Sequence, residues 1–254
     1  MSSDISVDIS SRGIATITLN RPERSNALDQ RTLDNLTAQF TALGADDRVR
    51  VVVLRGAGKH FCSGADLVAR ASEGEPGPER SSIVDMLAML DRLPKATVAA
   101  VHGAAIGGGA ALAACCDVVV AAEGAFFSVP EVRIGRPPLG VAPFLVRAMG
   151  FRSFRRYCLT GERFGAAEAL RTGLVHELVS AERFDEKVAE IADALLHGAP
   201  QAQRALKEDL EYSVTPSVAA IRARRASHGS AETAEAREGI ASFRQKRKPS
   251  WYPQ

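Results

Sequence analysis

Three consecutive glycines, Gly107, Gly108 and Gly109, interrupt the apolar stretch at residues 98–120, VAAVHGAAIGGGAALAACCDVVV. The residues before them are typical of a strand, and the small residues after them are typical of a helix. Glycine has no Cβ, so a ligand can approach the backbone closely here. The first N–H groups of a helix lack an internal acceptor and lie at the positive end of its dipole. The stretch therefore suits an oxyanion such as a thioester enolate, although a tight strand–helix junction inside an α/β core would show the same pattern.

Other ligand-binding patterns are excluded by their spacing. The residues GAGK at 56–59 are followed by His60, so the Ser or Thr of a Walker A loop is missing, and the three glycines lack the GxGxxG spacing of a dinucleotide site. The four cysteines have no zinc-like spacing, and two of them are adjacent in an apolar run. We expect buried, reduced thiols and no metal site.

The segments before the glycines predict the elements that position them. Residues 5–9 and 14–19 alternate apolar and polar side chains, which predicts a β-hairpin. Asp29 can cap a helix that runs to about Leu43. The continuous β-branched run at residues 49–54 predicts a buried parallel strand.

Strands alternate with helices up to about residue 130, and the remainder has almost entirely helical patterns. This order predicts an α/β core. We expect the core at residues 1–195 and a helical carboxyl-terminal extension at residues 196–254. The extension would act as a lid or an oligomerisation element and not as an independent domain.

Composition limits the classes of partner. Hydrophobic residues make up 46% and charged residues 24% of the 254 positions, as in ordinary globular proteins. A net charge of +2 provides no general attraction for nucleic acid. No stretch approaches the roughly 20 uninterrupted apolar residues of a membrane span, and the acidic first residues are unlike a secretory signal. We expect a cytoplasmic protein that binds neither nucleic acid nor membrane.

Over nearly its whole length the chain resembles the crotonase (enoyl-CoA hydratase/isomerase) superfamily, on five segments in that family's order. These are NRPERSNAL at 20–28, FCSGADL at 61–67, HGAAIGGGAALAACCD at 102–117, PEVRIG at 130–135 and FRQKRKPSW at 243–251. The resemblance implies a crotonase-like spiral of ββα units, assembled as a homotrimer or a dimer of trimers. It also implies an acyl-CoA substrate, so the coenzyme A thioester would be the substrate and no separate cofactor is expected.

The resemblance also assigns the catalytic groups. The backbone N–H groups of Ser63 and Gly108 would bind the thioester oxygen, and Glu131 of PEVRIG would act as general acid and base. Many family members have alanine at the position of Ser63, but a backbone donor does not depend on its side chain. A carboxylate that is partly buried has a raised pKa, which suits proton exchange near neutral pH.

Substrate contacts are expected along the same segments. Arg24 is the best single candidate for a phosphate contact, and the basic residues at 246–248, which a neighbouring subunit could contribute, are a second candidate. The expected substrate-binding residues are Arg24, Ala27, Ser63, Gly64, Ala65, Asp66, Gly107 and Gly108.

Ala111 is the main departure from the family's two-glutamate hydratases, which have GGGxE where this chain reads GGGAA. Either Glu131 does both proton transfers, or another carboxylate assists, or the reaction is a different one. Candidates for a second carboxylate are Asp66, which could equally cap a helix, and the acids of a polar loop, Glu73, Glu75 and Glu79. We interpret Asp117 as structural.

A second departure follows Glu131, where the chain reads GRPPLGVAP. This resembles a branch of the family that includes hydratases of branched or carboxylated acyl-CoAs. Arg133 or Arg136 could pair with a substrate carboxylate if either faces the pocket, although both could be surface residues. His102 could be a base or a structural histidine at a strand end.

The sequence thus predicts an enoyl-CoA hydratase-like lyase. Two alternatives stay open. One is another single-carboxylate crotonase reaction, namely isomerisation, decarboxylation or thioester hydrolysis. The other is a non-catalytic acyl-CoA binder.

Overall fold

The computed structural model describes residues 4–67, 69, 82–210 and 234–253. A six-stranded sheet forms its centre, in the order β1-β2-β3-β4-β6-β9. β1 and β2 are antiparallel, and each later neighbour pairs in parallel. The strands are β1 (Ile5–Ile9), β2 (Ile14–Leu19), β3 (Val51–Gly56), β4 (Ala96–Val101), β6 (Val118–Ala122) and β9 (Glu177–Val179).

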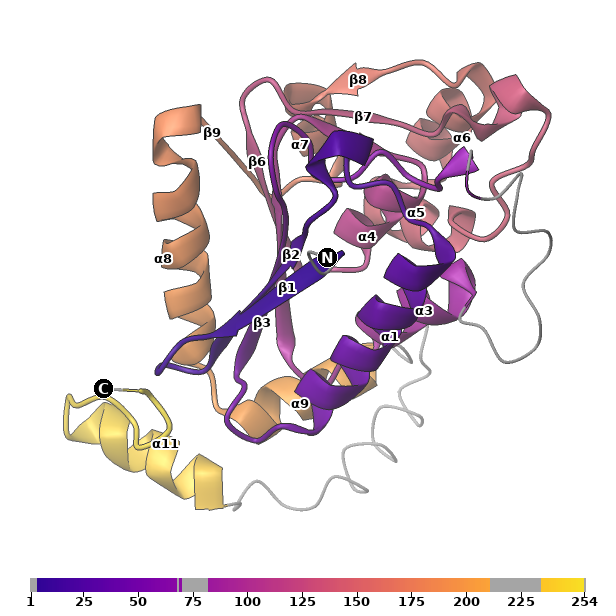
Figure 1. Ribbon diagram of the computed structural model, residues 1–254. Helices are drawn as coiled ribbons and strands as arrows, with labels where there is room; N and C mark the ends of the chain where they lie inside the picture. Colours follow the sequence, from indigo (N-terminus) through magenta and orange to yellow (C-terminus); the bar gives the residue numbers. More distant parts are fainter. Residues whose placement is uncertain (1–3, 68, 70–81, 211–233, 254) are drawn as a thin grey trace.

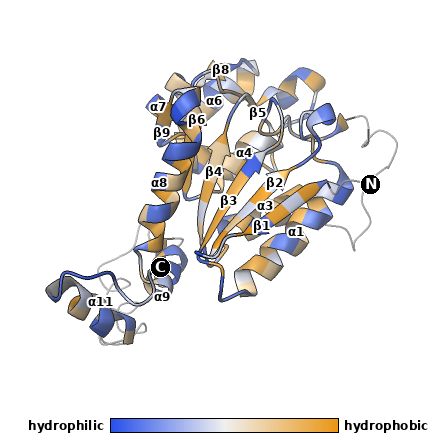
Figure 2. Cartoon of the chain, turned by 60° about the vertical axis from the view of Figure 1, so that its left-hand side comes forward, coloured by the Kyte–Doolittle hydropathy of each residue, from blue (hydrophilic) through white to orange (hydrophobic). Residues whose placement is uncertain are grey.

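Helices cover both faces of this sheet (Figure 1). α1 (Gln30–Ala45), α3 (Ile83–Asp91) and α4 (Gly108–Ala114) lie on one face, and α8 (Phe184–Leu196) lies on the other. Side chains along a strand alternate between the faces, so Val52 joins the first cluster and Val51 the second. Figure 2 shows the apolar colour continuing along the central strands, as expected for a sheet buried on both sides.

A second, three-stranded sheet lies beyond the carboxyl ends of the central strands, in the order β5-β7-β8. Three short helices pack around it, and three 3-10 turns occur in the connections. These elements are β5 (Ala104–Ile106), β7 (Phe126–Ser128), β8 (Phe164–Gly165), α5 (Ala142–Met149), α6 (Phe151–Thr160), α7 (Ala166–Thr172), η1 (Pro22–Arg24), η2 (Pro130–Ile134) and η3 (Ala181–Arg183).

Most of the predicted elements are confirmed. The amino-terminal hairpin pairs Ile5 with Leu19, and β3 is buried between two parallel neighbours. Asp29 caps α1, because its side chain accepts from the Thr32 N–H at 2.8 Å. The chain after about residue 130 was expected to be almost entirely helical, and this prediction is wrong for β8 and β9.

The carboxyl-terminal segment contains α9 (Pro200–Leu210) and α11 (Ala234–Arg244). The predicted boundary at residue 195 falls at the end of α8, and the division itself stays a prediction. Residues after α11 contact the core, because the Tyr252 hydroxyl donates to Asp193 at 2.7 Å and the Trp251 indole donates to the His197 carbonyl at 3.0 Å. Among the described helices, none combines the length and the apolarity needed to cross a bilayer.

Candidate functional site

Three segments distant in sequence are joined at the carboxyl end of the central sheet. Cys62 pairs with Ala105 of β5, through bonds from Cys62 N to Ala104 O and from Ile106 N to Cys62 O, each 3.0 Å. Leu28 pairs in turn with Ala65, through Leu28 N to Gly64 O at 2.7 Å and Asp66 N to Leu28 O at 2.9 Å. Residues 20–28, 61–67 and 104–109 therefore form one rigid unit.

Glycines allow the main chains of this unit to pack closely against each other. Gly64 has φ +88°, and a Cβ added there would lie 2.6 Å from the Ile106 carbonyl oxygen and 3.6 Å from the Gly108 nitrogen. A Cβ on Gly109 would overlap with the Cys62 carbonyl oxygen. Two main chains thus approach each other beside the amino-terminus of α4, as glycine permits.

The directions of the N–H groups separate the candidate donors. Gly108 is the first residue of α4, and Ala111 makes the first helical bond, to the Gly107 carbonyl at 3.0 Å, so the Gly108 N–H has no acceptor within the helix. The Ser63 N–H, predicted as the second donor, donates to the Ser25 carbonyl at 3.0 Å. In a parallel bridge the paired residue points its own N–H away from the partner. The Ala65 N–H is therefore directed away from Leu28, and no backbone acceptor takes it among the described residues.

Glu131 lies directly against the glycine turn. It occupies the first turn of η2, and a Cβ on Gly107 would overlap with Oε1 of Glu131 and lie 3.2 Å from its Cδ. Oε2 is buried and has no hydrogen-bond partner among the described residues. Burial raises the pKa of this carboxyl group above its ordinary value. The arrangement brings a carboxylate poised for proton exchange beside the Gly108 donor.

The described candidates for a second carboxylate have structural partners. Ala111 is fully buried in α4 and contributes only a methyl group. Asp66 is 8% exposed, pairs with Arg21 at 3.2 Å and accepts from the Ala69 N–H at 3.1 Å. Asp117 accepts from the Thr97 N–H at 2.8 Å and from Lys207 at 2.7 Å, so its structural interpretation is confirmed. Three further candidates, Glu73, Glu75 and Glu79, lie outside the described residues.

Asp66 has a testable structural role. We expect Asp66→Asn to lower the free energy of unfolding by about 1–3 kcal/mol, because the largely buried Arg21 loses one of its two anionic partners. Its kcat should stay unchanged, since the asparagine oxygen can still accept from the Ala69 N–H. Urea denaturation and turnover assays measure both. Glu162→Gln, which removes an exposed ion pair with Arg156, is the control and should leave the urea midpoint unchanged. A fall in kcat with unchanged stability would assign Asp66 to the chemistry instead.

The loop at residues 20–28 is held by side chains that the sequence did not single out. Arg21 pairs with Asp29 at 3.0 Å and donates to the Ala27 carbonyl at 2.7 Å. Asn26 is 1% exposed and donates to the carbonyls of Ala57 and His60 at 2.9 and 2.7 Å. The sequence signal was available, since a loop that contains Asn and Arg beside Pro needs internal partners for its backbone.

Arg24 and Ala27 differ in their exposure. Arg24 lies at the end of η1 with its side chain exposed to solvent, whereas Ala27 is 8% exposed. Arg24 is thus placed at the surface of the same loop that carries Leu28 to Ala65.

The side chains of the remaining candidates are engaged elsewhere or exposed, and the backbone N–H of Arg136 donates to the Glu131 carbonyl at 3.0 Å. The His102 ring lies edge-on to Phe184 of α8, on the opposite face of the sheet from α4, and its Nε2 bonds to the Gly58 carbonyl at 2.9 Å. Arg133 donates to the Thr160 carbonyl at 3.1 Å at the end of α6. Arg136 is exposed. The structure thus supports structural roles for His102 and Arg133.

The basic residues near the carboxyl terminus have intramolecular partners. Arg247 pairs with both oxygens of Glu238, at 2.6 and 2.8 Å, and the Lys248 ammonium lies 3.8 Å from the centre of the Tyr252 ring. Lys246 is exposed and has φ 52°. Of the three, Lys246 is the one most accessible to an external ligand.

Burial disfavours ionisation of the thiols. Complete burial raises the pKa of Cys62 to about 12, and burial raises the pKa of Cys115 and Cys116 as well. All four cysteines are free. Among the described residues, no three His, Cys, Asp or Glu side chains are grouped so that they could hold a metal ion.

Comparisons with known proteins agree with this geometry. Residues 10–254 match the model of the family described as enoyl-CoA hydratase/isomerase. The Mycobacterium tuberculosis protein named "Probable enoyl-CoA hydratase echA8" is 32% identical over 241 residues, 94% of each chain. The solved structure of AtuE from Pseudomonas aeruginosa is 36% identical, with a TM-score of 0.90 over 98% of this chain and 99% of that one. An enoyl-CoA hydratase from Mycobacterium smegmatis is 30% identical, with a TM-score of 0.89 over the same shares.

Proposed function

Because the chain belongs to the enoyl-CoA hydratase/isomerase family and has the crotonase fold, we propose that it is a hydratase-like lyase that adds water to an enoyl-CoA thioester. The observation that carries the proposal is the position of Glu131. Its buried carboxylate, with Oε2 unpartnered, lies against Gly107 and next to the first N–H of α4.

The thioester oxygen would be held by two backbone donors. Gly108 N–H is one. We assign the other to Ala65 and not to Ser63, because the Ser63 N–H already donates to Ser25. Each donor bonds more strongly as negative charge develops on that oxygen, and such a donor is worth roughly 2.7–4 kcal/mol in the barrier of other enzymes.

Glu131 would carry out both proton transfers. As a base, its ionised carboxylate takes a proton from water while the water oxygen attacks the β carbon of the enoyl group. The electrons of the double bond move into the thioester, and the resulting enolate is stabilised by Gly108 and Ala65. Glu131, now protonated, returns the proton to the α carbon and is ionised again. The methyl group of Ala111 leaves no second carboxylate at that position.

The coenzyme would enter along the loop at residues 20–28. Arg24 would contact a phosphate group, and Ala27, Ser63, Gly64, Ala65, Asp66 and Gly107 would line the path to the thioester. Apolar side chains at the start of α3 suit an acyl chain: Ile83 lies against Gly108, and Val84, beside Gly140, is 45% exposed. A homotrimer or a dimer of trimers is the assembly that we propose.

Incubation of the purified protein with crotonyl-CoA and with longer and branched enoyl-CoAs tests the proposal. We expect loss of the enoyl thioester absorbance and a product heavier by one water. The second candidate, double-bond isomerisation by a single carboxylate, is favoured by Ala111 and would leave the mass unchanged. Acyl-CoA binding in calorimetry without turnover of any substrate would contradict both reactions and indicate a non-catalytic binder.

A further inference from the structure

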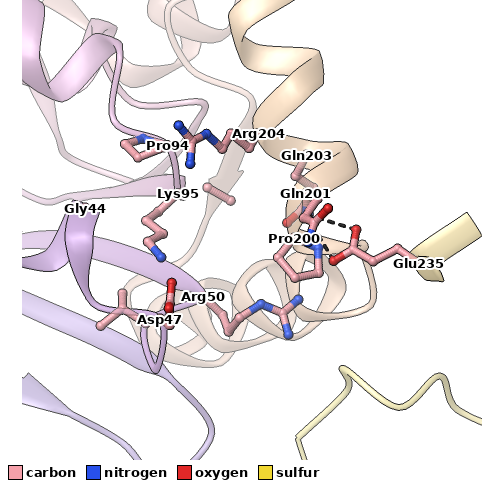
Figure 3. Close-up of a pocket in the computed structure, with 12 residues that line it drawn as sticks. Gly44, Asp47, Arg50, Pro94, Lys95, Pro200, Gln201, Gln203, Arg204 and Glu235 are labelled. Atoms are coloured by element: carbon pink, nitrogen blue, oxygen red, sulfur yellow. Dashed lines mark hydrogen bonds between the residues drawn. The ribbon is translucent and has the colours of Figure 1, made fainter. Parts of the chain in front are cut away.

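A cavity of about 340 Å³ (Figure 3) lies where β3 and β4 begin, whereas the glycine turn that contacts Glu131 follows the carboxyl end of β4. It is bounded by the residues that precede β3 and β4 and by the first turns of α9 and α11. β3 runs from this cavity to the loops of the acyl-CoA site, and its six residues span about 20 Å. The volume falls at the lower end of the range for small-molecule pockets, about 300–1,000 Å³.

Two cations in the lining have only carbonyl partners. Arg50 donates to the carbonyls of Gly198, at 2.8 Å, and Trp251, and Lys95 donates to the Asp46 carbonyl at 3.0 Å. No carboxylate forms an ion pair with either of them within the described part of the chain. The Nε of Arg50 is buried and has no partner there. A carbonyl satisfies a donor, but it does not neutralise a full positive charge.

The surroundings compensate the positive charge only in part. Burial lowers the pKa of Arg50, and the nearby negative charge of Glu235 opposes this effect. Burial also lowers the pKa of Lys95, which the positive charges of Arg50 and Arg204 lower further, while Asp47 and Asp46 oppose the shift. Glu235, on α11, accepts from the Gln201 N–H at the start of α9 at 3.0 Å, and Arg204 pairs with Glu208 at 3.0 Å. Figure 3 shows Lys95 and Asp47 on one side of the cavity, and the Arg50 side chain extending toward Pro200 and Glu235 on the other.

We propose that this cavity binds a small multivalent oxyanion, a phosphate or a polycarboxylate, between Arg50 and Lys95. The anion would accept a hydrogen bond from the unpartnered Nε of Arg50 and would balance the positive charges of these two half-buried cations. Bound there, it would join the start of the sheet to α9 and, through Arg50, to Trp251. The site is separate from the acyl-CoA site and does not depend on the proposed reaction.

Calorimetry on the full-length protein tests the site, with inorganic phosphate and citrate as probes and sodium chloride at matched ionic strength as the reference. We expect saturable binding of at least one probe. Binding of phosphate but not citrate would identify a phosphate-bearing ligand, and binding of citrate but not phosphate would identify a polycarboxylate. Binding of both would identify a site for multivalent oxyanions in general.

Variants locate the binding. Lys95→Met keeps the aliphatic stem but removes the charge, so the affinity for the probe should fall by about tenfold, as for loss of a charged hydrogen bond. Lys95→Arg keeps the charge and should retain the affinity. Arg152→Gln removes an exposed cation on α6 and should have no effect. Turnover of crotonyl-CoA should be the same in all three variants. Absence of saturation by both probes, or equal weakening in Lys95→Met and Arg152→Gln, would overturn the proposal.

Discussion

Glu131→Gln is expected to lower kcat by a factor of about 10²–10⁴, because an amide can neither take a proton from water nor return it to the α carbon. The amide has nearly the same shape as the carboxylate and fits against Gly107, so KM should change little. The result is measured as turnover of the best enoyl-CoA substrate. Glu123→Gln, at an exposed turn after β6, makes the same replacement away from the site and should retain full activity.

Glu131→Gln should be at least as stable toward unfolding as the parent protein at neutral pH. The pKa of Glu131 is raised in the folded protein, so this group favours folding when protonated, and that contribution is lost as the pH rises through the folded-state pKa. At neutral pH the glutamine removes a buried charge. A thermal midpoint below that of the parent protein would therefore attribute part of the lost activity to unfolding.

The pH dependence supplies an independent readout of the same group. Glu131 must be ionised to accept the first proton, so kcat/KM should rise with pH through a pKa above the ordinary value of 4.5. The residual activity of Glu131→Gln should lack this limb. A limb that persists in the variant would point to a different base.

Local patterns were sufficient for most of the fold. The alternation in β1 and β2, the β-branched run of β3 and the cap at Asp29 are properties of neighbouring residues, so the sequence predicts them directly. β8 and β9 have two and three residues, and their strand state depends on pairing with β7 and β6. A pairing made across the fold leaves no periodicity in so short a segment, and these two strands were missed.

In the site, too, some features could be predicted from local sequence and others depend on contacts made across the fold. Gly108 and Glu131 were predicted from the resemblance of their segments to the family's motifs, and the structure places Glu131 against the glycine turn that precedes Gly108. The choice between Ser63 and Ala65 depends on which way each N–H points, and that direction is set by Ser25 and by the bridge to Leu28. The ion pair of Arg21 with Asp66 also joins residues 45 positions apart. Such non-local contacts decide roles that residue identity leaves open.

Gly107→Ala is expected to lower kcat by at least about 10², because the new methyl group would overlap with Oε1 of Glu131 and displace the carboxylate. A shift of about 1 Å in a positioned group can cost that much. Gly107 has φ 52° and ψ −112°, a conformation that alanine adopts only with strain, so stability should fall by about 1–3 kcal/mol as well. Turnover per folded molecule, with the folded fraction determined by circular dichroism, measures the catalytic part.

Gly150→Ala separates the displacement of Glu131 from the backbone strain. Gly150 has φ 75° and ψ 152°, also outside the regions that alanine prefers, but a Cβ there would have no neighbour within 4 Å. We expect the two variants to lose comparable stability and only Gly107→Ala to lose kcat. In Gly107→Ala the rising limb of kcat/KM should also move, since the displaced carboxylate would be more exposed to solvent and its pKa would approach the ordinary value. Equal kcat in both variants would show that the position of Glu131 against Gly107 is not required for catalysis, and the single-carboxylate mechanism would then lose its geometric basis.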